Sequence, residues 1–124
     1  MEHLILNPTN YTPGVNFNYS TGALEITGTA TPEDSYNFFQ PLIRWFDDYK
    51  SKPASTTTLI FKMEYFNTSS TVFMLRLMKG AASLDIAGHP VKIKWYYKEN
   101  DDDCYEAGKD FGTLAKMDIE LIAM

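Results

Sequence analysis

The amino-acid sequence predicts an α/β fold in which helices pack against a single mixed β-sheet. Two observations lead to this prediction. A β-hairpin pattern occupies the first part of the chain, and segments of strand character then alternate with segments of helical periodicity. A hairpin pairs its strands antiparallel, whereas strand–helix–strand alternation favours parallel pairing. The length of 124 residues fits one domain, so we expect residues 1–124 to form a single domain.

The first part of the chain has the pattern of short strands. Residues 4–6 form a short apolar run, and residues 15–19 and 23–27 alternate apolar and polar side chains. Such alternation is typical of half-buried strands. Residues 20–22, Ser-Thr-Gly, supply turn chemistry between the two alternating segments. We therefore expect a hairpin, with a possible additional strand before it.

A helix start is expected at Thr31. Thr31 is a suitable N-cap, Pro32 suits the first helical position, and the two acidic residues that follow favour the positive end of a helix. Apolar residues then recur at helical spacing at Phe39, Leu42, Ile43 and Phe46. Pro41 lies inside this pattern and removes one backbone hydrogen bond, so we expect a kink or a break there.

The middle of the chain predicts a strand followed by a helix. Residues 57–65 are rich in β-branched and aromatic residues, which favour a strand. A helical pattern then extends over residues 72–84, and Gly88 and Pro90 end it. The apolar face expected for this helix consists of Val72, Leu75, Met78 and Ala82.

The last part of the chain predicts two further strands, at residues 91–97 and 118–122, and a short helix at about residues 105–111. An acidic run separates the first of these strands from the helix. It consists of Asp101, Asp102 and Asp103, and we expect it to be a solvated loop.

Composition excludes several classes of function. The formal net charge is −5 and no basic stripe is apparent, which argues against nucleic acid as a partner. No apolar run approaches ~18 residues and no secretion leader is recognisable, so we expect a cytoplasmic protein without membrane insertion. Cys104 is the only cysteine, so an internal disulfide is impossible.

No catalytic, metal or cofactor site emerges from the remaining motifs. A calcium loop that started at Asp101 would need glycine at its sixth position, which is Glu106. His3 and His89 have no nucleophile beside them, and the acidic run should disfavour the thiolate of Cys104. We therefore expect no enzyme activity, no metal and no cofactor.

The junction between residues 64 and 70 is the strongest functional candidate. Small polar residues follow a predicted strand and precede a predicted helix, so either Asn67 or Thr68 can be the N-cap. Capping alone would explain one such residue, and it remains the simpler interpretation. Four consecutive small polar residues, however, suggest an exposed recognition surface. At such a helix start, unpaired N–H groups and the helix dipole would accommodate a phosphate on Thr68.

Four neighbours of Thr68 are candidate partner-binding residues: Phe66, Asn67, Ser69 and Ser70. Tyr65 and Phe66 are neighbours on a strand and should face opposite sides, so one belongs to the core and the other can flank a binding patch.

Residues 65–70, Tyr-Phe-Asn-Thr-Ser-Ser, resemble the Tyr-x-Asn-Thr-Ser-Ser signature of the SiaC family of bacterial regulatory phosphoproteins. Further similarity lies at Thr12-Pro13, at residues 28–39 and at residues 91–97. The resemblance implies a fold like that of the anti-sigma-factor antagonists (STAS-like). It also implies that a dedicated kinase phosphorylates Thr68 and that a PP2C-type phosphatase resets it. The unphosphorylated form would bind and activate a diguanylate cyclase, in c-di-GMP signalling that promotes biofilm formation.

Three hypotheses follow. The first is a non-enzymatic phosphoprotein in which phosphorylation of Thr68 switches binding to a partner protein. The second is a constitutive interaction or scaffold module without a phosphorylation cycle. The third, a small enzyme, would require a pocket that holds titratable groups with perturbed pKa values.

Overall fold

Strands and helices alternate along the computed structural model, which describes residues 1–124. In chain order the elements are β1 (Leu4–Leu6), β2 (Gly14–Phe17), β3 (Ala23–Ala30), α1 (Ser35–Ser51), β4 (Thr57–Phe66), α2 (Thr68–Ile86), β5 (Val91–Tyr97), α3 (Asp102–Ala115) and β6 (Ile119–Ala123). The six strands form one sheet in the order β1-β2-β3-β4-β5-β6. The expected single mixed sheet with packed helices is confirmed.

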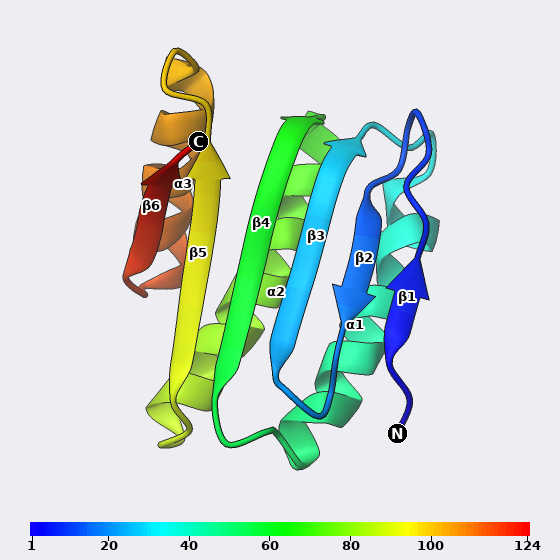
Figure 1. Ribbon diagram of the computed structural model, residues 1–124, viewed down its shortest axis with the longest axis vertical. Helices are drawn as coiled ribbons and strands as arrows, with labels where there is room; N and C mark the ends of the chain where they lie inside the picture. The colour runs from blue at the N-terminus through cyan, green and yellow to red at the C-terminus, as the bar shows by residue number, and fades with distance from the viewer.

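Strand directions divide the sheet into two parts. β1, β2 and β3 pair antiparallel, whereas β3, β4, β5 and β6 pair parallel. The additional first strand and the hairpin are both confirmed, and Gly22 takes a positive φ of 76° in the connecting turn, where glycine is favoured. All three helices lie behind the sheet in Figure 1, so they cover one face and leave the other open.

Alternation along the strands sorts side chains between these two faces. In β4, Leu59, Phe61 and Met63 are buried under the helices, while the intervening Ile60 and Lys62 lie on the open face and are only partly covered. The buried residues form one hydrophobic cluster of 23 members. Trp95 in β5 is fully buried in it.

The start of α1 differs from the prediction at Thr31 and Pro32. The helix begins at Ser35, and the N-cap is Asp34, whose Oδ1 accepts a hydrogen bond of 3.0 Å from the Asn37 amide. The amide of Thr31 instead donates to the Tyr11 carbonyl at 2.7 Å, which ties this segment to the loop before β2. The helix then continues through Pro41 to Ser51, so of the expected kink or break, the break does not occur.

The second helix is longer than predicted, and its buried face matches the predicted one only in part, at Met78 and Ala82. Its buried apolar residues are Met74, Leu77, Met78, Ala81, Ala82 and Leu84. Val72, which the prediction placed on the apolar face, is 57% exposed. The prediction failed at Val72 because apolar residues occur on more than one side of this helix. The side that packs against the sheet is the one that contains Met74.

The acidic run is not a loop. Asp101 is the N-cap of α3, and its Oδ1 accepts a hydrogen bond of 3.0 Å from the Cys104 amide. Asp102 and Asp103 occupy the first turn, where the positive end of the helix dipole favours carboxylates. The predicted short helix at residues 105–111 is therefore the middle of a longer one.

None of the three helices has the combination of length and apolar character that crossing a membrane would require.

Candidate functional site

The candidate site lies at the edge of the sheet where β3 and β4 end and α1 and α2 begin (Figure 1). Two hydrogen bonds fix the start of α2 to the end of β3. The Asn67 amide donates to the Ala30 carbonyl at 2.9 Å, and Ser70 Oγ donates to the same carbonyl at 3.2 Å. The first turn of α2 is thus held against the sheet.

Asn67, not Thr68, is the N-cap of α2. Its Oδ1 accepts hydrogen bonds from the Ser70 amide at 3.0 Å and from Ser69 Oγ at 3.1 Å. Thr68 is therefore the first helical residue. The first N–H groups of a helix have no intrahelical acceptor, so the backbone near Thr68 carries positive potential.

The four consecutive hydroxyl residues from 68 to 71 differ in their surroundings. Ser70 is fully buried, and Ser69 Oγ is shared between Asn67 and Ser35. Thr71 is half-buried, and its Oγ1 donates to the Thr68 carbonyl at 2.6 Å. Thr68 is exposed, and its hydroxyl makes no hydrogen bond within the chain. Of the four hydroxyls, only that of Thr68 is both accessible and free.

The candidate partner-binding residues are distributed between surface and interior. Ser69 is exposed and Asn67 is half-buried. Ser70 has no exposed surface, so the expectation that it faces a partner is wrong: its hydroxyl serves to hold α2 to β3. Phe66 is half-buried, and its ring centroid lies 5.7 Å from that of Trp95.

The expected division between Tyr65 and Phe66 is confirmed. Phe66 packs on the helix side of the sheet, where its ring also lies 6.4 Å from that of Phe111. Tyr65 is 63% exposed. Tyr65, rather than Phe66, is thus the aromatic residue available beside Thr68.

Sequence reasoning missed an aromatic contact near the site. Tyr36 in α1 is 54% exposed, and its ring meets that of Phe73 in α2 edge to face at 6.3 Å. Phe73 also stacks on the buried Phe39 at 5.6 Å, with an interplanar angle of 8°. No local signal pairs residues of two different helices, so this contact was not predictable. The proximity of Val72 to Thr68 was predictable from the sequence, because residues four apart lie on the same side of a helix.

The other reactive groups do not converge on this site. Burial raises the pKa of the Cys104 thiol, and the nearby charge of Asp101 raises it further. His3 stacks on Tyr19 and accepts a hydrogen bond from its amide, while His89 is exposed in a turn. No group of three His, Cys, Asp or Glu side chains is placed to hold a metal ion.

Comparison with known proteins places this geometry in context. The model of the SiaC family of regulatory phosphoproteins matches residues 6–124. Apo-SiaC from Pseudomonas aeruginosa superposes with a TM-score of 0.88 at 23% identity, covering 100% of this chain and 99% of that one. SiaC in the crystal structure of diguanylate cyclase SiaD with its activator SiaC, from the same organism, gives a TM-score of 0.91 at 24% identity, covering 98% and 99%.

A protein related in sequence also comes from Pseudomonas aeruginosa. An uncharacterized protein of Pseudomonas aeruginosa strain UCBPP-PA14 is 26% identical over 111 residues, which are 90% of this chain and 88% of that protein. The solved structures share the fold over nearly the full length of both chains.

Proposed function

The chain belongs to the SiaC family of regulatory phosphoproteins, and we propose that it is a binding switch controlled by phosphorylation of Thr68. The proposed mechanism has two states. In the unphosphorylated state the protein binds its partner, and in the phosphorylated state it retains its fold and loses the partner. The protein acts through binding and not through catalysis.

The observation that carries this proposal is the selective availability of one hydroxyl. Thr68 is exposed and unbonded, whereas the hydroxyls of Ser69, Ser70 and Thr71 are each engaged with the chain. A kinase can reach the Thr68 oxygen without opening the fold. The same modification at Ser70 would require α2 to detach from β3.

The position of Thr68 explains why phosphorylation would spare the fold. A phosphate adds about −1.5 to −2 charges and three acceptor oxygens. At an exposed helix start, the dipole favours negative charge by about 0.3–1 kcal/mol. Buried in an interface without a cationic partner, the same dianion would be costly to desolvate. The expected effect therefore falls on binding rather than on stability.

The proposed partner is a diguanylate cyclase, because the relative SiaC is the activator of the cyclase SiaD in their solved complex. A dedicated kinase and a PP2C-type phosphatase would set the phosphorylation state. Because a kinase and a cyclase both consume nucleoside triphosphates, we assign the protein to the cytoplasm. The STAS-like classification of the fold stays a prediction.

The experiment compares wild type with Thr68→Ala and Thr68→Asp. Purified diguanylate cyclase SiaD of Pseudomonas aeruginosa serves as the probe, and both its affinity for each variant and its production of cyclic di-GMP are measured. We expect Thr68→Ala to bind and activate like wild type and Thr68→Asp to do neither. Equal binding of all three forms would favour a constitutive interaction module instead.

A further inference from the structure

The exposed side of α2 carries more than the phosphorylation site. Thr68, Val72, Arg76 and Lys79 are all exposed and follow one another at intervals of four, four and three residues. Residues at these intervals lie along one side of a helix, and we call the four the outer stripe of α2. At about 1.5 Å per residue, Arg76 lies roughly 12 Å and Lys79 roughly 17 Å along the helix from Thr68.

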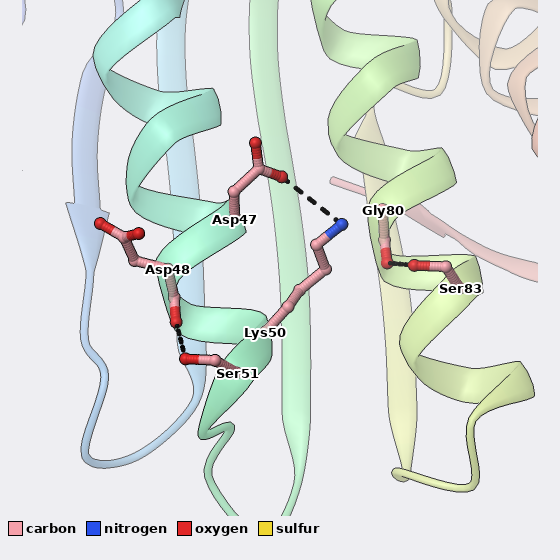
Figure 2. A network of polar contacts seen from close by, with 6 residues as sticks. All are labelled: Asp47, Asp48, Lys50, Ser51, Gly80 and Ser83. Atoms are coloured by element: carbon pink, nitrogen blue, oxygen red, sulfur yellow. Dashed lines mark hydrogen bonds and ion pairs between the residues drawn. The ribbon is translucent and has the colours of Figure 1, made fainter.

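A groove of about 320 Å³ lies beside this stripe, between α1 and α2. Buried apolar side chains form its floor: Ile43, Phe46 and Leu77. Gly80 allows the two helices to approach closely, because a Cβ at that position would lie only 2.8 Å from Phe46 Cε1. Lys50 extends from α1 toward α2 above this contact, as Figure 2 shows.

The charge of the groove is opposite to that of the chain. Three cations, Lys50, Arg76 and Lys79, line it together with one carboxylate, Asp47. Asp47 pairs with Lys50 at 3.4 Å (Figure 2), whereas Arg76 and Lys79 make no ion pair. Three positive charges and one negative leave the groove with a local excess of two positive charges, in a protein whose net charge is −5.

An aromatic contact lies on the same two helices, outside the groove itself, and Phe73 stands between Thr68 and the groove residue Leu77 along α2. Tyr36 leans on Phe73 there, and Tyr36 is more than half exposed. Tyrosine and arginine are enriched among the residues that dominate binding energy at protein interfaces. An aromatic residue outside the groove and unpaired cations along it are the features of a docking surface for an amphipathic, acidic segment.

We propose that this face, formed by the outer stripe of α2 with Tyr36, Phe73 and Lys50, docks an acidic segment of the diguanylate cyclase. This inference rests on the proposed function and adds the chemistry of the contact. Thr68 heads the same stripe that carries Arg76 and Lys79. A phosphate of about −1.5 to −2 charges there would repel carboxylates of the docked segment that lie near the start of the stripe. Phosphorylation would thus weaken binding through charge repulsion as well as through the cost of desolvating the phosphate.

The test is a charge reversal with a matched control. Arg76→Glu/Lys79→Glu reverses the groove, and Lys92→Glu/Lys109→Glu makes the same change of net charge on β5 and α3. Affinity for purified SiaD is measured by calorimetry at about 50 mM and about 500 mM salt. We expect the groove variant to bind at least about tenfold more weakly than wild type, and the control to stay within about threefold. We also expect salt to weaken wild-type binding, by screening the attraction, and to strengthen whatever binding the groove variant retains, by screening the repulsion. Circular dichroism verifies that both variants are folded.

Thr68→Asp in the same series separates the two proposals. If it loses SiaD while the groove variant binds normally, the switch stands and the docking surface is wrong. If the groove variant loses SiaD while Thr68→Asp binds normally, the docking surface stands and the switch is wrong. Equal losses in the groove variant and its control would show a nonspecific charge effect and overturn the docking surface. If wild type does not bind SiaD, the assignment of the cyclase fails, and the docking surface fails with it.

Discussion

The hydroxyl oxygens of Ser35 and Ser69 lie 2.5 Å apart and join the first turns of α1 and α2. Ser69 has one hydroxyl proton, and it also lies within hydrogen-bond distance of Asn67 Oδ1. When Ser69 donates that proton to Asn67, Ser35 must be the donor to Ser69. The chain of hydrogen bonds therefore connects α1 to the N-cap of α2, immediately beside Thr68.

The Ser35–Ser69 contact should appear as an energetic coupling. We expect a double-mutant cycle with Ser35→Ala and Ser69→Ala, measured by urea denaturation, to give a coupling of about 0.5–1.5 kcal/mol. Each single change removes one partner of the same hydrogen bond, so the double variant should lose less than the sum. Strict additivity of the two changes would mean that the contact does not stabilise the fold.

Asn67 should matter to stability and Thr68 should not. Asn67→Ala removes the acceptor of the Ser70 amide, and loss of an N-cap costs about 0.5–2 kcal/mol of unfolding free energy. Asn67→Asp keeps an acceptor at the same place and is the matched control, expected to stay near wild type. Thr68→Asp should be neutral or stabilising by about 0.3–1 kcal/mol. A melting temperature that drops for Thr68→Asp as much as for Asn67→Ala would contradict this division of roles.

Gly108 is required for α3 to lie close to the sheet. A Cβ at this position would stand 2.5 Å from Trp95 Cδ1 and 2.7 Å from Leu121 Cδ2. Overpacking of this kind costs about 1–3 kcal/mol, against a gain of about 1 kcal/mol in helix propensity, so Gly108→Ala should destabilise the protein.

Gly112→Ala, one turn later on the same helix, is the comparison for Gly108→Ala. Its Cβ would meet the Met117 carbonyl oxygen at 3.2 Å, which requires only a small shift. Thermal denaturation should therefore rank Gly108→Ala below Gly112→Ala, and the reverse order would show that α3 does not rest on Trp95.

Cys104 should make stability depend on pH in the alkaline range. Burial, and then the charge of Asp101, raise the pKa of its thiol in the folded state. The folded protein thus holds the thiol proton more tightly than the unfolded chain does. This contribution is complete below the ordinary thiol pKa of about 8.5 and is lost as the pH rises toward the folded pKa.

The matched variant for this effect is Cys104→Ala, which removes the titrating group and leaves the lysines and tyrosines in place. We expect the unfolding free energy of wild type to fall more steeply above pH ~8.5 than that of the variant. Parallel curves for the two proteins would show that the thiol is not perturbed by burial.

Local patterns were sufficient to predict the types and order of the elements. The turn residues at 20–22, the β-branched run before Tyr65 and the polar junction at Asn67 each act within a few residues of the chain. The junction in particular identified the start of α2 and the location of Thr68. The acidic run also has the composition of a helix start, which its interpretation as a solvated loop overlooks.

What the sequence could not show depends on contacts between distant residues. Thr31 is a good N-cap in isolation, but its amide is taken by the Tyr11 carbonyl. The proximity of Tyr36 to Phe73 and of Lys50 to Gly80 exists only once α1 and α2 lie side by side. The positive groove is invisible in a chain with an overall negative charge, because its cations come from separate helices.

The most direct measurement uses authentic phosphothreonine at position 68, installed during synthesis of the full chain. Calorimetry then compares the affinity of the modified and unmodified proteins for purified SiaD, with circular dichroism to verify the fold of each. The account predicts that the unmodified protein binds and that the phosphorylated protein, still folded, binds at least about tenfold more weakly. Equal affinities, or a phosphorylated protein that has lost its fold, would contradict it.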